Sequence, residues 1–130
     1  MRIEVRLPKV KPGEYEVREG CAYAGCAGRD FKRHGREGER KPHRDIRYEA
    51  VRSYRWKCMR CGRTFRVYPP GVSQAQQSDR LKAISVLLYV LGLSYGGTAD
   101  ILTALGCGIG KTTVYRNVQA AGEVARRASE

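Results

Sequence analysis

The chain of 130 residues lacks a long apolar run. No segment approaches the roughly 18 apolar residues that a membrane-spanning helix requires, and the N-terminus lacks the apolar core of a secretory signal peptide. Cysteine occurs five times, and this odd number argues against a secreted disulfide framework. We therefore expect a protein of the reducing cytoplasm that has no membrane partner.

Acidic residues are also scarce. The sequence contains 13 Asp and Glu against 25 Lys and Arg, which gives a formal net charge of +12. Most of the excess lies in residues 29–66, with 14 basic and 5 acidic residues, whereas residues 67–130 carry 6 and 4. A field of one sign attracts polyanions, so nucleic acid is the first candidate partner. Charge that serves only solubility is the alternative.

The first half of the chain has the alternating pattern of short strands. Alternation predicts strands at residues 2–7, 46–56 and 64–68, with a turn at 58–62 between the last two. Residues 27–42 are rich in Gly, Arg and Lys, which predicts a solvated loop that contributes nothing to a core. A small antiparallel sheet is therefore expected.

The second half has helical periodicity. A Pro-Pro-Gly triplet predicts a linker at residues 69–73 between a first module, 1–68, and a second, 74–130. We expect one helix from Ser78 or Asp79 to about residue 91, and another over residues 99–105 that is capped by Thr98. Buried positions are predicted at Leu81, Ile84, Leu88 and Leu91 of the first helix and at Ile101, Leu102 and Leu105 of the second.

Four of the cysteines form two close pairs, Cys21 with Cys26 and Cys58 with Cys61, separated by 31 residues. Two turns that each supply two thiolates, about 2.3 Å from a metal, meet the requirement of a tetrahedral zinc site. In the second pair, Gly62 permits the backbone to curl so that amides support the sulfur charge. We expect one structural Zn²⁺, which has no open position for activating water.

The sequence allows three alternatives to the four-cysteine zinc site. The cysteines could be ordinary buried thiols, or Cys58 and Cys61 could be a redox dithiol, which would need a βαβ context that the sequence lacks. His34 and His43, in the basic loop, could each replace a cysteine as a ligand. For both histidines, contact with solvent or phosphate is the expected role.

A third helix is predicted to begin at Thr112 or Thr113 and to pack through Val114, Val118, Ala121 and Ala125. With the helix before the Gly106 turn it would form a helix-turn-helix. Its DNA-contacting side chains would be Lys111, Thr112, Thr113, Tyr115, Arg116, Asn117 and Gln119, of which Arg116, Asn117 and Gln119 suit purine edges. The basic residues expected on phosphates in the first module are Arg33, Arg36, Arg55, Arg60 and Arg63.

Two other functions of the helical half are less favoured. A plain three-helix bundle or a dimerisation unit would need no exposed polar face on the third helix. A nucleotide-binding loop at Gly110-Lys111-Thr112 is rejected because Leu105 stands where the motif requires its first glycine, and because a helix precedes it.

Three segments are similar to parts of the N-terminal region of bacterial insertion-sequence transposases. Residues 54–65, YRWKCMRCGRTF, resemble its zinc ribbon, and residues 87–95 with 111–116 resemble its helix-turn-helix. In that family these modules recognise terminal inverted repeats, and a separate RNase H-like domain supplies three carboxylates for metal-dependent strand cleavage. The four aspartates here, Asp30, Asp45, Asp79 and Asp100, fall in predicted loops and caps, so we expect no catalytic domain in this chain.

The sequence thus predicts an α+β chain, a small antiparallel zinc ribbon followed by a three-helix helix-turn-helix domain. The resemblance implies sequence-specific binding of double-stranded DNA, without enzymatic activity, as the recognition part of a transposase associated with the bacterial nucleoid. Expected partners are duplex DNA, a separate catalytic subunit and a second copy of the chain. A stand-alone transcriptional regulator and an RNA-binding zinc ribbon are the alternative functions, the latter exposing aromatic rings for stacking.

Overall fold

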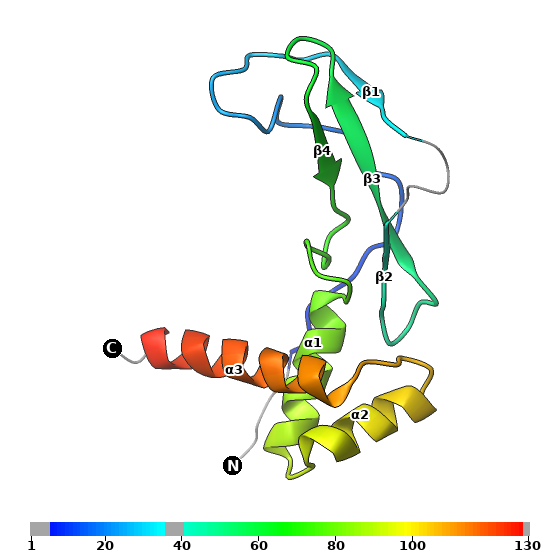
Figure 1. The fold of residues 1–130 in the computed structure, drawn as a ribbon, viewed down its shortest axis with the longest axis vertical. Coiled ribbons are helices and arrows are strands. Elements are labelled where there is room, and N and C mark those ends of the chain that lie inside the picture. Colours follow the sequence, from blue (N-terminus) through cyan, green and yellow to red (C-terminus); the bar gives the residue numbers. More distant parts are fainter. Residues whose placement is uncertain (1–5, 36–40, 129–130) are drawn as a thin grey trace.

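The computed structural model of the protein describes residues 6–35 and 41–128. In it, a small antiparallel sheet forms one end of an elongated molecule and three helices form the other (Figure 1). The mixed α+β architecture is therefore confirmed. The strands are β1 (Phe31–Arg33), β2 (Lys41–His43), β3 (Val51–Cys58) and β4 (Thr64–Val67), and the helices are α1 (Asp79–Val90), α2 (Tyr95–Ala104) and α3 (Lys111–Ala128).

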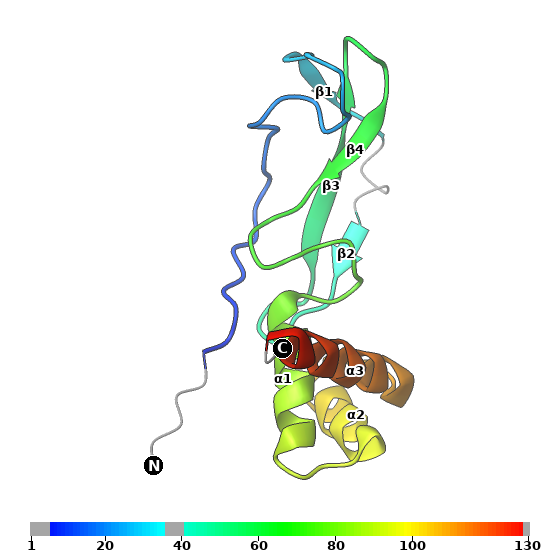
Figure 2. The same ribbon diagram turned by 90° about the vertical axis from the view of Figure 1, so that its left-hand side faces the viewer.

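Strand β3 is the centre of the sheet. It pairs antiparallel with β1, β2 and β4, and both β1 and β4 contact its residues 56 and 57, so they lie on its two opposite edges. The N-terminal segment runs beside the sheet and the helices in an extended path (Figure 2). Residues 2–5 of the predicted first strand lie outside the described residues, and residues 6 and 7 belong to no strand.

The central strand is shorter than the alternating pattern predicted. Residues 46–49 form bends rather than strand. The Asp45 carboxylate accepts hydrogen bonds from the backbone amides of Arg47, at 3.0 Å, and Tyr48, at 3.2 Å, which turns the chain before β3 begins. The prediction that residues 27–42 are only a solvated loop is also wrong, because β1 and the start of β2 lie within them.

Alternation along the paired strands gives the sheet two unlike faces. One face, here called the aromatic face, carries the rings of Phe31, Tyr54, Trp56 and Phe65. Phe31 and Phe65 meet edge to face, with 5.8 Å between ring centroids. The other face, here called the cationic face, carries Lys32, Arg55, Lys57 and Arg66.

Serine caps define where the first two helices begin. The Ser78 hydroxyl accepts from the Leu81 amide at 3.1 Å, which confirms the predicted start of α1. The predicted cap of α2 at Thr98 is wrong: Ser94 accepts from the Gly97 amide at 2.9 Å, so α2 begins at Tyr95 and includes two glycines in its first turn. Thr98 itself is fully buried.

The helices enclose a small apolar core. Leu81, Leu102 and Val114 are fully buried at its centre, and the residues packed around it include Ile84, Leu88 and Val118. The prediction of buried side chains was wrong for Leu91, Ile101 and Leu105, which are 69%, 40% and 61% exposed. Leu91 lies beyond the last residue of α1, and three helices are too few to cover every apolar side chain.

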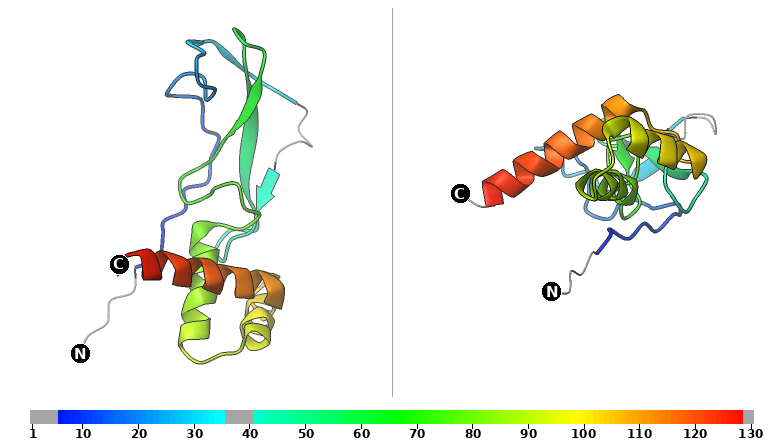
Figure 3. Two further views of the ribbon diagram at one scale, coloured as in Figure 1. Left: turned by 60° about the vertical axis from the view of Figure 1, so that its left-hand side comes forward. Right: turned by 90° about the horizontal axis from the view of Figure 1, so that it is seen from below.

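A buried polar cluster joins the sheet to the helices. The fully buried Asp45 carboxylate accepts from the Ser78 hydroxyl at 2.6 Å and pairs with Arg80 at 2.5 Å. Beside it, Arg44 forms a parallel bridge with Gln77. In Figure 3, α1 continues below the sheet, and α3 crosses α1 at a steep angle. The domain boundary at residues 69–73 stays a prediction.

Candidate metal centre

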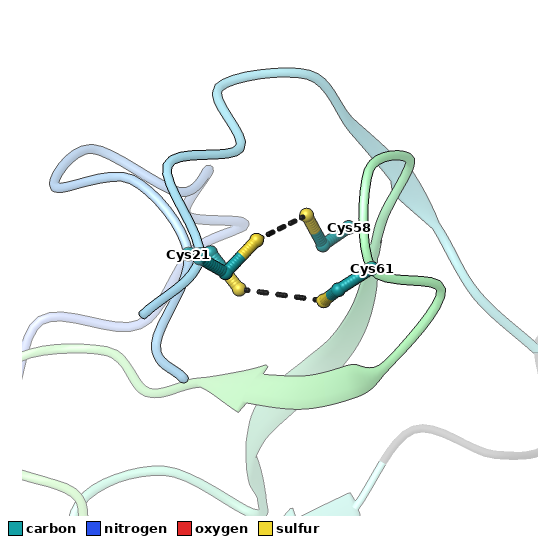
Figure 4. Close-up of side chains that lie close together, drawn as sticks. Cys21, Cys58 and Cys61 are labelled. Carbon is teal, nitrogen blue, oxygen red and sulfur yellow. Dashed lines mark hydrogen bonds between the residues drawn. The ribbon is translucent and has the colours of Figure 1, made fainter. Parts of the chain in front are cut away.

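Four cysteine side chains that are distant in the sequence meet at the end of the sheet farthest from the helices. Cys58 ends β3 and Cys61 lies in the turn before β4, while Cys21 and Cys26 lie in the loop before β1. Figure 4 shows Cys21 on one loop opposite the turn that carries Cys58 and Cys61, with a dashed line between the Cys21 and Cys61 sulfurs. All four sulfurs lie within 4.8 Å of one another, so the predicted clustering of the two pairs is confirmed.

The distances between the sulfurs fit a single ion. Cys21 and Cys61 sulfurs are 3.8 Å apart, and those of Cys26 and Cys58 are 3.7 Å apart. A metal about 2.3 Å from each of four sulfurs, at tetrahedral angles, would separate them by about 3.8 Å. The four side chains could therefore hold a metal ion with little rearrangement.

The turn that carries the second pair is shaped by its glycine. Gly62 has φ of +74°, in the left-handed region that favours glycine. This geometry lets the Gly62 amide donate to the Cys58 carbonyl at 2.9 Å, and the Cys58 amide donate to the Arg63 carbonyl at 3.0 Å. The curl predicted from the Cys-x-x-Cys-Gly spacing thus brings Cys58 and Cys61 to the same side of the turn.

A second glycine, which the sequence analysis missed, allows the two halves of the site to meet. A Cβ atom at Gly28 would overlap the Cys58 sulfur and would lie 3.3 Å from the Cys26 sulfur. Only a residue without a side chain fits between these sulfurs. The position of Gly28 two residues after Cys26 does not indicate this role in the sequence, because its close approach to the Cys58 sulfur depends on β3, which is far away along the chain.

The thiol groups do not ionise alike. Backbone amides of Cys61 and Arg60 donate toward the Cys58 sulfur and lower its pKa to about 7, although desolvation opposes this. At Cys21 the backbone amide of Tyr23 also lowers the pKa, but desolvation and the neighbouring sulfurs outweigh it and raise the pKa to about 12. The Cys58 thiol is therefore more readily ionised at neutral pH than the Cys21 thiol.

Neither histidine joins this cluster among the described residues. His34 is exposed. His43 is fully buried, with Nδ1 2.6 Å from the Ala75 carbonyl and Nε2 2.8 Å from the Ser53 hydroxyl. The expectation that His43 contacts solvent or phosphate is therefore wrong, because the pairing of β2 with β3 turns its ring into the interior.

The predicted DNA-contacting residues of α3 divide between two sides of the helix. The exposed ones are Lys111, Thr112, Tyr115, Arg116 and Gln119, whereas Thr113 is partly buried. Asn117 lies on the inner side, where its amide exchanges hydrogen bonds with Gln77 at 2.9 and 3.1 Å and donates to Ser85 at 3.0 Å. These bonds occupy the side chain that was expected to read bases.

The predicted basic residues of the sheet end have different surroundings. Arg33 pairs with Glu14 and lies 4.1 Å from the centre of the Tyr54 ring. Arg63 lies 5.0 Å from the centre of the Tyr23 ring, and Arg55 donates to the Thr64 hydroxyl at 3.0 Å. Arg60 is exposed, and Arg36 lies outside the described residues.

Comparison of the chain with protein-family models, with curated proteins and with solved structures finds no match. No helix in the described part of the chain is long and apolar enough to cross a membrane. What stands on geometry alone is a four-cysteine site that could bind a metal ion, at one end of a mixed sheet and helix structure.

Proposed function

We propose that the four cysteines bind one Zn²⁺ and that this ion is structural. An all-thiolate donor set in tetrahedral arrangement suits zinc, and four protein ligands leave no position for water or substrate. Among the described residues, the buried apolar cluster beside the sheet consists of Val10, Val51 and Val72, with Tyr48 and Tyr68 packed against it. Binding of the metal would therefore supply much of the stability of this end.

Zinc content and its removal test this part of the proposal. Purified protein should contain one zinc per chain, and a strong chelator should abolish the sheet signal in circular dichroism. The variant Cys58→Ser should fail to bind zinc. Cobalt substitution should give the absorption of a tetrahedral thiolate site. Protein without metal whose fold is indifferent to the chelator would refute the proposal.

We further propose that the chain binds double-stranded DNA, with α2 and α3 as a helix-turn-helix and α3 as the recognition helix. The observation that carries this proposal is the exposed polar face of the first half of α3. Val114 is fully buried and Val118 packs against the core, so the opposite face of the helix remains outside. Exposed there are Lys111, Thr112, Tyr115, Arg116 and Gln119.

These side chains have different roles in the proposed complex. Lys111 and the hydroxyl groups of Thr112 and Thr113 suit phosphate oxygens, whereas Arg116 and Gln119 can each make two hydrogen bonds to a purine edge. Asn117 is left out, because its hydrogen bonds hold α3 against α1. The strong positive charge of the sheet end would supply affinity for DNA that does not depend on the DNA sequence.

The transposase relationship rests on the resemblance of residues 54–65, 87–95 and 111–116 alone. On that basis we propose that the chain is the DNA-recognition part of such a system, acting with a separate catalytic subunit and as a homodimer on terminal repeats. A stand-alone transcriptional regulator would use the same surface. Binding to the chain's own promoter, with no effect of a catalytic partner on occupancy, would favour the regulator.

The packing of the aromatic rings disfavours the RNA-binding alternative. Stacking of single-stranded bases needs open ring faces. Here the guanidinium of Arg33 covers Tyr54, and Phe65 contacts the edges or faces of Tyr23 and Phe31, with 6.3 and 5.8 Å between centroids. The rings of the aromatic face mainly contact protein.

Selection from a random duplex library, followed by fluorescence anisotropy with the selected and a scrambled duplex, tests DNA recognition. Arg116→Ala or Gln119→Ala should reduce the preference for the selected duplex by about 5- to 150-fold, since one bidentate contact contributes about 1–3 kcal/mol of discrimination. Arg127→Gln, at the far end of α3, is the matched control. Equal affinity of the unmodified protein for both duplexes would refute sequence-specific binding.

A further inference from the structure

The sheet places cations in direct opposition across its strands. On the cationic face, Lys32 pairs with Lys57 and Arg55 pairs with Arg66. Directly opposite residues of an antiparallel pair have Cβ atoms about 5 Å apart, at which distance like charges destabilise the sheet. The protein therefore holds two repulsive pairs side by side on one small surface.

Nothing in the strands compensates this charge. The four strand sequences, FKR, KPH, VRSYRWKC and TFRV, contain no acidic residue. Among the described residues, Lys32 and Lys57 take part in no ion pair. Arg55 donates to the Thr64 hydroxyl at 3.0 Å, and Arg66 donates to the Ser53 carbonyl at 3.1 Å. A hydroxyl or carbonyl oxygen carries no full charge, so these two hydrogen bonds do not themselves neutralise the guanidinium groups.

The spacing of the pairs indicates the kind of anion that they fit. Residues 55 and 57 lie on one side of the same strand, about 6.8 Å apart. That distance is too great for one small anion to contact both pairs closely. A duplex carries a phosphate every ~3.4 Å of axis on each strand, so its backbone can neutralise both pairs together.

We propose that the cationic face, Lys32, Arg55, Lys57 and Arg66, is the surface through which the sheet binds the phosphate backbone of duplex DNA. This inference rests on the proposed DNA-binding function and names a contact surface for the sheet end. Arg33, by contrast, lies on the opposite face and pairs with Glu14. Of the described basic residues that the sequence placed at phosphates, Arg33, Arg55, Arg60 and Arg63, only Arg55 belongs to the cationic face.

The salt dependence of binding tests this surface. Lys32→Gln/Lys57→Gln removes two charges from the cationic face, and Arg52→Gln/Arg127→Gln removes two exposed charges elsewhere, one of them from the opposite face of β3. Dissociation constants for one duplex are measured by anisotropy over a series of salt concentrations. The slope of log affinity against log salt should fall by about 1.8 for the first variant, about 0.9 per lost phosphate contact, and should not change for the second.

Thermal melting supplies an independent readout. Without DNA, Lys32→Gln/Lys57→Gln should melt at the same temperature as the unmodified protein or higher, because a repulsive pair has been removed. Weaker DNA binding by a variant that is at least as stable cannot be explained by misfolding. A lower melting temperature in the free state would overturn the argument from repulsion.

Further outcomes would also overturn this proposal. Equal slopes for the two double variants would mean that net charge, rather than this face, determines binding. A slope change with RNA but not with DNA would assign the face to RNA. If either outcome is found but the preference for the selected duplex still depends on Arg116, the proposed DNA-binding function stands and only the role of the cationic face is refuted. If the unmodified protein does not bind duplex DNA at all, both proposals are refuted.

Discussion

Replacement of Asp45 by alanine is expected to be the most damaging single change outside the cysteine site. The Asp45 carboxylate is fully buried where the sheet meets the helices. It accepts hydrogen bonds from the guanidinium of Arg80, from the Ser78 hydroxyl and from the amides of Arg47 and Tyr48. Asp45→Ala leaves these donors without their acceptor and leaves a largely buried guanidinium without a counter-charge.

Two routes give the magnitude of this effect. Removing one partner of a buried ion pair costs about 3–5 kcal/mol. Separately, burial raises the pKa of Asp45, but hydrogen bonds from Arg80 and Ser78 outweigh it and lower the pKa from 3.8 to about 2. A shift of that size corresponds to about 2 kcal/mol of stability from ionisation alone. The truncation also removes hydrogen bonds that survive protonation, so a loss of about 3–5 kcal/mol is expected.

Urea unfolding of zinc-loaded protein at neutral pH, followed by helical circular dichroism, measures this loss. Asp45→Ala/Arg80→Met removes both charges and should be no less stable than Asp45→Ala, since no buried unpaired charge remains. A loss below about 1 kcal/mol, or a double variant that shows the sum of the two single losses, would refute the reasoning.

The pH dependence of stability checks the same group. Because the folded-state pKa of Asp45 is depressed, its contribution is complete above the unfolded pKa near 3.9 and is lost as pH falls toward about 2. The stability difference between the unmodified protein and Asp45→Asn should therefore shrink across this range. Release of zinc in acid affects both proteins alike, so the difference between them is the quantity to measure. A difference that does not change with pH would contradict the assigned pKa.

Three further perturbations test the site and the helix packing. Gly28→Ala should weaken zinc binding at least about tenfold, because the added methyl group would displace the Cys58 sulfur; competition with a chromophoric chelator measures this. Gly122→Ala, which places a methyl group in open space, is the control and should not change zinc affinity. Zinc affinity should fall as pH decreases, more steeply below about 7 where the Cys58 thiol must also lose its proton, and a pH-independent affinity would exclude thiolate ligands. Asn117→Ala should lower the free energy of unfolding by about 1–3 kcal/mol without changing base preference, and an altered preference at one base pair would show that Asn117 does contact DNA.

Local features of this chain could be recognised before any tertiary structure was known. The spacing of Cys58 and Cys61 before Gly62 is enough to define a turn that presents two sulfurs. Both the φ of Gly62 and the backbone hydrogen bonds of the turn depend only on residues 58–63. The cap at Ser78 likewise depends only on the amide three residues later. Short-range geometry made these predictions reliable.

Features that depend on which distant segments meet were mispredicted or missed. The cap of α2 lies at Ser94 rather than Thr98, because Thr98 lies inside the helix with its side chain fully buried. His43 was placed in a solvated loop because its own neighbours are polar, whereas strand pairing buries it. The inner position of Asn117 depends on the packing of α3 against α1 and Gln77.

The sequence by itself determined an α+β chain with a strong positive charge, two cysteine pairs and three helices that each have an apolar side, since composition and periodicity are properties of the chain alone. Only the tertiary structure decided that Gly28 lies against the Cys26 and Cys58 sulfurs and that Asp45 joins the sheet to α1. It also decided that Lys32 and Lys57 share one face. The physical reason is that strand register and close packing pair residues that are tens of positions apart, and a shift of one residue would exchange the two faces of the sheet.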